Sequence, residues 1–515
     1  MVILYHSNNR VVSVVSELDG IVPFDKSATI AAALVNLAQQ FPDSILLWCH
    51  QSLQAHLNVS EIEDLFHHKK LLLSFNPSES PFIDSAIGYA DASLFVPISK
   101  MVSFPSWQMS SVVGGVSAEV LLALNAAIPL KDNFDYFLCS LAKLAMPRGL
   151  LCYSEPLLLK PNSLSIPSKG SLYTLFRFVK QHYKTRWVFL LVFNLFLYER
   201  KLPILPFLFS LFYKNRTKIA IHLDGIIVQS SKKVIGKATV DVIIPTIGRK
   251  TYLYDVLKDF SKQTLLPNKI VIVEQNPEAG SKTELDYIQN EKWPFEIQHI
   301  FTHQAGACNA RNLALNETKS EWVFLADDDN RFESTLLAAI FDKIKQFGNQ
   351  VVTTSYPQKN EIKKYNNLIQ WPTFGAGNSV IKRVLLEKVR FNNAFEFGYG
   401  EDSDFGMQLR NQGNDVLYLP EPEILHLKAP MGGFRTKPVL QWQKDAVQPK
   451  PSPTIMLFQL LHCTTEQTNS YKTILFLQYY RLQSITNPIR YYSHFKKQWD
   501  RSVFWANQLK QQNEV

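Results

Sequence analysis

The sequence is poor in cysteine, and its five cysteines are not arranged for disulfides or zinc. They are widely spaced, and no two of them form a CxxC pair: Cys49, Cys139, Cys152, Cys308 and Cys463. An odd number without such pairs argues against a disulfide framework or a cysteine zinc site, and indicates reduced thiols in a cytosolic setting. Residues 1–5 are a short strand-like run followed by polar residues, in which we recognise no signal peptide.

Long apolar runs are also missing. Residues 187–198 are apolar except for Asn194, but they number only twelve, and Pro203 and Pro206 follow soon after. Because a transmembrane helix needs about 20 apolar residues, we expect no clean membrane span here. The wider stretch 170–215 is dense in Phe, Leu, Tyr and Trp, with Lys and Arg between them. It fits either a buried helical pair that packs two domains together or helices lying in the membrane interface.

Charge is low and mildly positive. Charged residues make up 19% of the chain and apolar residues 46%, which describes a folded protein. The net charge of +9 is small for 515 residues. It suits an anionic ligand or an anionic membrane surface, and we expect no nucleic-acid partner. The length alone predicts at least two domains.

Alternating strand and helix patterns divide the chain into four parts. We predict an α/β domain over residues 1–165, an aromatic and basic helical linker over 166–235, a second α/β domain over 236–435, and a helical region over 436–515. In the first domain, residues 44–48 and 71–75 have the pattern of buried strands and 27–40 that of a helix, which predicts a largely parallel sheet. This domain has no acid cluster and no glycine-rich phosphate loop.

The most informative stretch lies in the second α/β domain. An apolar run of strand type, residues 322–326, ends at three consecutive carboxylates, Asp327, Asp328 and Asp329. A buried strand delivers such residues to the carboxyl edge of a sheet, where open α/β folds bind ligands. Adjacent acids repel one another unless a cation lies among them, and oxygen ligands suit Mg²⁺ or Mn²⁺. The alternative is a solvated acidic turn.

Two further strand ends point to the same edge. Residues 239–244 form a strand pattern that ends at 245–249 and is followed by a helix pattern over 252–260. Residues 269–273 form another, ending at Glu274, and a small-residue loop at 303–312 runs into a helix. Three strand ends followed by polar residues predict one crevice with nucleotide-binding geometry.

Acidic residues recur later in this domain. A turn at 375–379 precedes a predicted helix over 381–388, and Glu401, Asp402 and Asp404 then start a helix that continues to Arg410. Acids at a helix N-terminus are favoured as caps, but capping needs one such residue rather than three. A closing strand is predicted at 414–419, and His426 follows it.

These ordered motifs resemble the family 2 glycosyltransferases of GT-A fold, a Rossmann-like nucleotide-diphospho-sugar transferase fold, over residues 238–435. Residues 242–249 look like the family's opening strand and nucleotide loop, which implies donor contacts from Pro245, Thr246 and Arg249. Glu274 stands where the family usually has Asp at the base or ribose, so the base is not determined. Gly306 and Arg311 resemble the loop beside the nucleotide.

The same resemblance implies the chemistry. Asp327–Asp329 matches the DxD metal motif, with Asp328 at the donor, and Glu401–Asp402 matches the ED motif, whose Asp is the expected base. His426 lies where some members place a further metal ligand. We therefore expect an inverting sugar transfer that depends on Mn²⁺ or Mg²⁺. The expected donor is a nucleotide sugar, with a UDP-sugar as the leading candidate. The cation would neutralise the diphosphate leaving group, and a base of this kind contributes roughly 10²–10⁴ in rate.

The acceptor is expected from what members of this family commonly use and from the aromatic and basic helical stretches, and the location from these stretches and the reduced cysteines. We expect the hydroxyl of a glycan or a polyprenyl-linked acceptor, in surface polysaccharide synthesis. The protein would be cytoplasmic and peripheral at the inner face of the cytoplasmic membrane. Trp371 and Tyr399 could stack on a sugar ring, or belong to ordinary packing.

The first domain can be laid on the second. Gly115–Ser117 falls on Gly377–Ser379, and Leu47 on Leu325, so that Cys49, His50 and Gln51 replace the three aspartates. In the same alignment Phe137 and Leu138 replace the ED pair. The hypothesis is a degenerate GT-A copy that serves as a scaffold or positions the acceptor. The alternative is two unrelated α/β domains.

Two other function classes share some of these sequence features. A sugar nucleotidyltransferase also uses acids and a metal, but it needs a glycine-rich loop with a basic residue after the first strand, and residues 245–249 match that poorly. A non-catalytic glycan-binding or assembly protein would not need the acids of the second domain. Loss of metal-dependent donor hydrolysis on replacing Asp402 would separate an enzyme from a binding protein.

Overall fold

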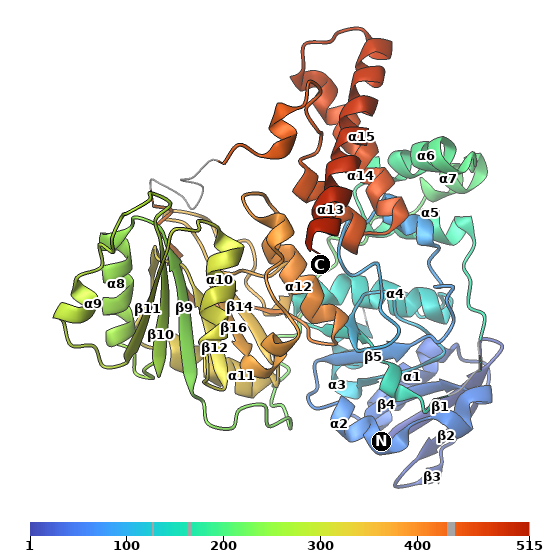
Figure 1. Ribbon diagram of the computed structural model, residues 1–515. Helices are drawn as coiled ribbons and strands as arrows, with labels where there is room; N and C mark the ends of the chain where they lie inside the picture. Colours follow the sequence, from blue (N-terminus) through green and yellow to red (C-terminus); the bar gives the residue numbers. More distant parts are fainter. Residues whose placement is uncertain (126–127, 162–163, 165, 430–437, 514–515) are drawn as a thin grey trace. The chain divides into compact units, whose positions relative to one another are not determined.

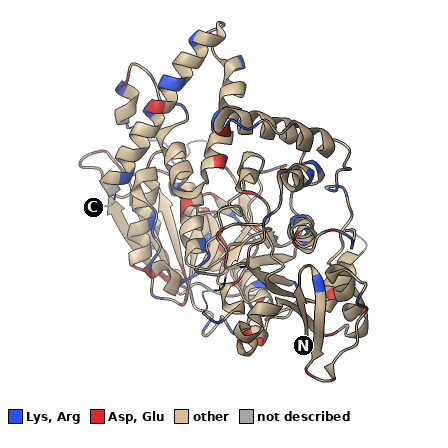
Figure 2. Cartoon of the chain, turned by 90° about the vertical axis from the view of Figure 1, so that its right-hand side faces the viewer, with Lys and Arg blue, Asp and Glu red and all other residues tan. Residues whose placement is uncertain are grey.

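The chain forms two compact units, each built on its own sheet (Figure 1). The computed structural model describes residues 1–125, 128–161, 164, 166–429 and 438–513. Unit 1 contains Met1–Lys232, Asn411–Gly413 and Cys463–Leu477; unit 2 contains Lys233–Arg410, Asn414–His462 and Gln478–Val515. The predicted boundary at 435/436 lies outside the described residues. Lys and Arg are scattered along the chain and interleaved with Asp and Glu (Figure 2).

Unit 1 has an eight-stranded mixed sheet of order β3-β2-β1-β4-β7-β5-β8-β6. Its strands are β1 (Val2–Ser7), β2 (Arg10–Ser16), β3 (Gly20–Ile21), β4 (Ile45–His50), β5 (Leu71–Phe75), β6 (Phe104–Pro105), β7 (Val113–Ser117) and β8 (Leu151–Ser154). Of the paired neighbours, β1–β4 and β5–β8 are parallel and the others antiparallel. The prediction of a largely parallel sheet is therefore wrong. One reason is local, because Asn8 and Asn9 take positive φ (51° and 58°) and close a two-residue hairpin between β1 and β2.

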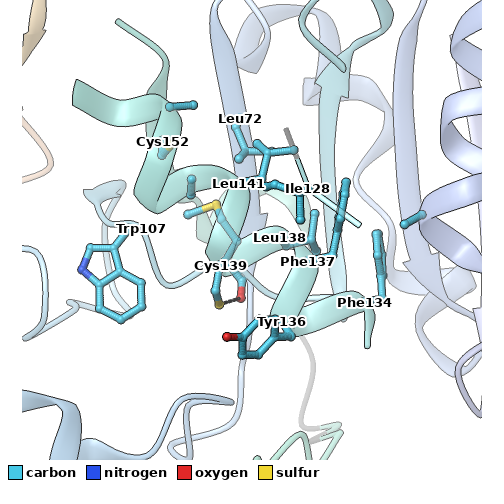
Figure 3. Packing of buried hydrophobic residues seen from close by; sticks show 14 of the residues in the cluster. Leu72, Trp107, Ile128, Phe134, Tyr136, Phe137, Leu138, Cys139, Leu141 and Cys152 are labelled. Carbon is cyan, nitrogen blue, oxygen red and sulfur yellow. Dashed lines mark hydrogen bonds between the residues drawn. The ribbon is translucent and has the colours of Figure 1, made fainter. Parts of the chain in front are cut away.

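The helices of unit 1 cover this sheet and supply its core. They include α1 (Ile30–Gln40), α2 (Ile62–Leu65), α3 (Ala118–Leu124), α4 (Phe134–Ala145), α5 (Leu172–His182), α6 (Arg186–Glu199) and α7 (Ile204–Ser210). Asn133 caps α4 by accepting the Tyr136 N–H, and Phe137 and Leu138 lie in the apolar cluster drawn in Figure 3. Nearly all of α4 is buried, as expected for a helix that is apolar on most of its faces.

Unit 2 has a second eight-stranded mixed sheet, of order β11-β10-β9-β12-β16-β14-β17-β15. Its strands are β9 (Val240–Thr246), β10 (Lys269–Gln275), β11 (Glu296–Thr302), β12 (Trp322–Ala326), β14 (Val351–Ser355), β15 (Ile369–Gln370), β16 (Asn378–Lys382) and β17 (Leu417–Glu423). Strands β11, β10, β9 and β12 run parallel, which places their carboxyl ends at one edge. The predicted strands at 239–244, 269–273 and 322–326 are confirmed.

The helices of unit 2 include α8 (Lys250–Ser261), α9 (Tyr287–Asn290), α10 (Ala307–Asn316), α11 (Leu336–Phe347), α12 (Glu401–Asn411), α13 (Pro453–His462) and α15 (Pro488–Asn513). Helix α14 (Thr465–Tyr479) belongs mostly to unit 1. Among the described residues, no helix combines the length and the apolar character needed to cross a bilayer.

Two expectations for unit 2 need correction. Residues 381–388 are not a helix, because Asn378–Lys382 is strand β16, antiparallel to both β12 and β14, and only a 3-10 turn follows. Val380 and Ile381 are β-branched and fully buried, which favours a central strand over a helix. The closing strand predicted at 414–419 is β17, which begins at Leu417 and runs on to Glu423.

The two sheets share a six-strand pattern. Reading β1-β4-β7-β5-β8-β6 beside β9-β12-β16-β14-β17-β15 gives the same chain order and the same sequence of parallel and antiparallel neighbours. In the register, Leu47 lies opposite Gly115, whereas Leu325 lies opposite Ser379. Once Leu47 is matched to Leu325, Gly115 therefore matches Ser379, and its predicted match to Gly377 is off by two residues.

Candidate active site

The parallel strands of unit 2 deliver the predicted donor and metal residues to one cavity. Strands β9 and β12 are neighbours, so Thr246 and Asp327 leave the sheet at the same edge. A cavity of about 310 Å³ opens there. It is lined by these predicted residues: Pro245, Thr246, Arg249, Arg311, Asp327, Asp328, Asp329, Glu401 and His426. The crevice expected from the strand ends is therefore present in the fold.

Predicted residues that do not line this cavity are Glu274, Gly306 and Asp402. On β10 successive side chains point to opposite faces, and it is Gln275 that lines the cavity. The Glu274 carboxylate instead accepts hydrogen bonds from the Thr283 hydroxyl (2.5 Å) and the Glu284 N–H (3.1 Å), and lies 2.9 Å from His299 Nε2.

The three aspartates are held in different ways. Asp328 is buried and accepts hydrogen bonds from Thr246 Oγ1 (2.7 Å) and Arg249 (2.6 Å). Asp329 is buried as well, and accepts from the Ala429 N–H (2.9 Å) and from Arg249 (3.3 Å). Asp327 remains half-buried at the cavity. A solvated acidic turn is therefore the wrong description of this stretch.

Burial and pairing separate the pKa values of these acids. Burial raises the pKa of Asp328 to about 6, although Arg249 opposes the shift. Burial also acts on Asp329, but hydrogen bonds from His426 and the Ala429 N–H hold its pKa below the ordinary value. The hydrogen bond to Asp329 in turn raises the pKa of His426 above its ordinary value. Asp329 is thus held as a carboxylate, with His426 as its partner.

Asp327, Asp329 and His426 form a set of three side chains that can hold a metal ion. Each offers one ligand atom, and the three atoms lie within 4.8 Å of one another. The set depends on a two-stranded pairing of β13 (Asn330–Arg331) with β18 (Leu425–His426), in which Asn330 lies opposite His426. The two carboxylate oxygens suit Mg²⁺ or Mn²⁺, and the imidazole nitrogen favours Mn²⁺, a transition metal, over Mg²⁺, which prefers oxygen ligands.

Tyr356 supports this set, and the sequence analysis missed it. Its hydroxyl donates to Asp327 Oδ2 (3.2 Å) and also bonds Asn330. Its ring stacks on the His426 imidazole at 4.5 Å between centroids. The available signal was its position, because it is the first residue after β14, at an end of a central strand.

Asp402 is placed at the start of α12. One of its carboxylate oxygens accepts the Ala376 N–H at 3.4 Å, and the other is buried without a hydrogen-bond partner among the described residues. Burial raises the pKa of Asp402 to about 7, with Arg311 opposing and Glu401 adding to the shift. A carboxylate of this kind is suited to take a proton near neutral pH.

The third acid of α12 has a structural role. Asp404 lies 2.7 Å from His462 Nε2 of α13 and accepts a 2.7 Å hydrogen bond from Gln408. Asp402 has no such partners, so the two aspartates of this helix are not equivalent.

A carboxylate of the same chain accepts hydrogen bonds from the first N–H groups of α10. Glu396 accepts the N–H groups of Cys308 (3.2 Å) and Asn309 (2.9 Å). Gly306 takes a φ of 149°, and a side chain there would collide with Glu396. This is the structural reason for glycine in the loop, and sequence reasoning missed Glu396.

A second cavity of unit 2, of about 290 Å³, is lined by aromatic residues. Trp371 stacks on Tyr418 at 4.6 Å between centroids, and Tyr365 meets Trp371 edge-on at 5.1 Å. Tyr356 also lines this cavity. Tyr399 lines neither cavity and is 65% exposed. Of the two residues predicted to stack on a sugar ring, Trp371 therefore lines a cavity and Tyr399 does not.

Comparison with known proteins supports the resemblance seen in the sequence. Residues 241–402 match the family model described as Glycosyl transferase family 2. The chain is 24% identical over 184 residues to the GalNAc(5)-diNAcBac-PP-undecaprenol beta-1,3-glucosyltransferase of Campylobacter jejuni, covering 33% of this chain and 58% of the relative. It is 25% identical over 124 residues to the cholesterol galactosyltransferase of Borreliella burgdorferi, covering 24% and 34%.

Solved structures match this chain at lower sequence identity than these two relatives do. The crystal structure of S. aureus TarS 1–349 in complex with UDP-GlcNAc matches with a TM-score of 0.34 and 18% identity, covering 48% of this chain and 74% of that chain. The crystal structure of GalNAc-T7 with UDP, GalNAc and Mn²⁺ matches with a TM-score of 0.32 and 13% identity, covering 40% and 45%.

Proposed function

We propose that this chain, whose residues 241–402 form a domain of glycosyl transferase family 2, transfers a sugar from a nucleotide-diphosphate donor to an acceptor hydroxyl with inversion. The single observation that carries the proposal is the pairing of two features in unit 2. One is the ligand set of Asp327, Asp329 and His426. The other is Asp402, a buried carboxylate with one oxygen unpartnered among the described residues and a raised pKa.

The donor side is supported by the residues around the cavity. The ligand set fits a divalent cation, which when bound would neutralise the charge of a diphosphate leaving group. Arg249 holds Asp328 and Asp329 in place, and Arg311 lies 3.4 Å from Asp327. Lys428 also lines the cavity and adds positive charge next to the acids. The donor class, a UDP-sugar, follows from the family resemblance.

The acceptor side rests on Asp402. The base would take the proton from the acceptor hydroxyl while the sugar leaves the diphosphate, so that the new bond forms on the opposite face and the anomeric configuration inverts. Glu401 lines the donor cavity beside it. The aromatic cavity at Trp371 offers a surface on which a sugar ring can stack. A polyprenyl-linked glycan is our preferred acceptor, because the name of the Campylobacter relative contains one.

We also propose that unit 1 is a degenerate copy of this domain. The shared six-strand pattern supports common origin. With Leu47 matched to Leu325, Cys49, His50 and Gln51 stand in place of the three aspartates. Cys49 is fully buried, and burial raises its thiol pKa to about 12, so it offers no ready metal ligand. A scaffold or acceptor-positioning role fits these replacements.

The proposal is tested by incubating the full chain with nucleotide sugars and Mn²⁺. Donor binding should raise the melting temperature with one donor more than with others. Metal-dependent release of the nucleoside diphosphate should follow, and Asp402→Asn should abolish it while keeping the donor-dependent shift. Pyrophosphate release from a nucleoside triphosphate and a sugar phosphate would instead favour a sugar nucleotidyltransferase. Mn²⁺-dependent donor binding that survives Asp327→Asn combined with Asp329→Asn would argue against the assigned ligand set.

A further inference from the structure

Helices α6 and α7 of unit 1 leave large apolar side chains in solvent. Within 25 residues, twelve such side chains are between 38% and 86% exposed: Phe189, Phe193, Phe196, Leu197, Leu202, Ile204, Leu205, Leu208, Phe209, Leu211, Phe212 and Tyr213. We name this set the α6–α7 apolar surface. Contiguous exposed apolar surface of this kind marks an interaction site in a folded protein.

In α6, one face packs into the core of unit 1, and the opposite face belongs to the α6–α7 apolar surface. In α6, Val188, Leu191 and Leu195 are fully buried and belong to the core of unit 1. Asn194, the polar residue in the apolar run, is buried too, and Thr473 donates a 2.7 Å hydrogen bond to it. The exposed apolar positions of α6, 189, 193, 196 and 197, recur with helical spacing on the opposite side. Packing of unit 1 therefore explains one apolar face of α6 and leaves the other unexplained.

The surface is held in place by ring contacts between helices. Phe189 of α6 meets Phe207 of α7 edge-on at 5.2 Å between centroids. Tyr173 of α5 meets Phe209 of α7 at 5.8 Å in the same way. The outward side chains thus come from α6, α7 and the residues that flank α7, and ring contacts join these helices to each other and to α5 (Figure 1).

Along residues 184–218, the exposed charged side chains are all basic. Exposed basic residues accompany it from 184 to 218: Lys184, Arg186, Arg200, Lys201, Lys214 and Lys218. The one acidic residue in this stretch, Glu199, is paired with Lys201 at 2.8 Å. Apolar aromatic helices with a basic border match the border between lipid headgroups and acyl chains in an anionic membrane. A second copy of the chain fits less well, because it would bring two basic borders together.

We propose that the α6–α7 apolar surface binds the surface of an anionic membrane, inserting Phe and Leu side chains below the headgroups while Lys and Arg pair with lipid phosphates. The proposal is independent of the sugar transfer proposed above. A membrane-bound enzyme would, however, meet a lipid-linked acceptor where that acceptor resides.

The test is co-sedimentation of the full chain with vesicles of phosphatidylcholine alone or mixed with phosphatidylglycerol. Binding should require phosphatidylglycerol, and the triple variant Phe193→Ser, Phe196→Ser and Phe212→Ser should weaken it at least ten-fold. The paired variant Arg200→Gln and Lys201→Gln should weaken binding and reduce its sensitivity to salt.

The matched control is Leu18→Ser with Ile21→Ser, which removes apolar side chains at and just before β3 that are at least as exposed (87% and 85%), and should leave binding unchanged. Unchanged melting temperatures confirm that the variants are folded, because the replaced side chains are exposed. Equal binding to neutral vesicles overturns the proposal, as does binding that the triple variant leaves intact. Failure of the wild-type chain to bind vesicles, with concentration-dependent self-association lost in the triple variant, overturns it in favour of a dimer.

Discussion

Replacing Asp402 with asparagine should cost activity and increase stability. The fold keeps this carboxylate buried, with one oxygen lacking a hydrogen-bond partner among the described residues. Asparagine preserves the size of the side chain and can still accept the Ala376 N–H, but it cannot take a proton. We expect transfer to fall by roughly 10²–10⁴ with donor binding retained.

The stability effect follows from the pKa. Burial raises the pKa of Asp402 from 3.8 to about 7, so the folded state holds this proton more tightly than the unfolded state. Folding stability therefore falls as pH rises between these two values, and the whole cost is present above pH 7. A difference of about 3 pKa units corresponds to about 4 kcal/mol at most, and relaxation around the charge lowers this. Because asparagine does not ionise, Asp402→Asn removes this free-energy cost of burying a charge.

Thermal unfolding of both proteins from pH 5 to pH 8.5 measures the effect. Each kcal/mol should raise the melting temperature by about 2–4 °C, so the advantage of Asp402→Asn should reach several degrees at pH 8 and shrink toward pH 5. Asp404→Asn is the matched control in the same helix, and should destabilise because it weakens the contact with His462. If Asp402→Asn unfolds at a lower temperature than the wild type at pH 8, or transfers sugar at the wild-type rate, the assignment of Asp402 as a buried base with a raised pKa is wrong.

Three further predictions concern the same site. Gly377→Ala should place a methyl group against the Asp327 carboxylate and weaken Mn²⁺-dependent donor binding, measured by calorimetry. The control Gly225→Ala adds a methyl group with no heavy atom within 4 Å and should leave donor binding unchanged. Equal donor affinity in the two variants would contradict the role of Asp327 as a metal ligand. Tyr356→Phe keeps the ring but loses the hydrogen bond to Asp327, so Mn²⁺ affinity should drop about 10–100-fold, and an unchanged Mn²⁺ titration would show that the hydroxyl does not position the ligand. The kcat/KM of the wild type should rise with pH as Asp402 loses its proton, with a midpoint at or below about 7 because a bound cation favours the carboxylate; a flat profile would count against this base.

Local sequence was sufficient for the parts of the site that lie at strand and helix ends. Residues 322–326 are apolar throughout and stop at three acids, so the strand, its end and the position of the carboxylates could all be predicted. The same holds for Thr246 at the end of β9 and for the acids at the start of α12. The reason is that alternation, apolar runs and polar strand ends are properties of adjacent residues.

Pairings between distant residues were decided by the tertiary structure. Residues 378–382 became a strand because two buried neighbours, β12 and β14, needed a partner between them, and local spacing does not contain that information. Likewise the β1–β2 hairpin made the first sheet mixed. Nothing near Glu274 in the sequence indicates that its carboxylate accepts hydrogen bonds from Thr283 and Glu284, away from the cavity.

What the sequence by itself determined is where β9 and β12 end and where α12 begins, and with these ends the acids Asp327, Asp328, Asp329 and Glu401 that line one cavity of unit 2. What only the tertiary structure decided is which distant side chains meet those acids. His426 reaches Asp329 through the pairing of β13 with β18. Tyr356, just after β14, hydrogen-bonds Asp327 and stacks on His426. The physical reason is that an element's ends follow from local chemistry, whereas contacts between elements depend on how all buried surfaces are satisfied together.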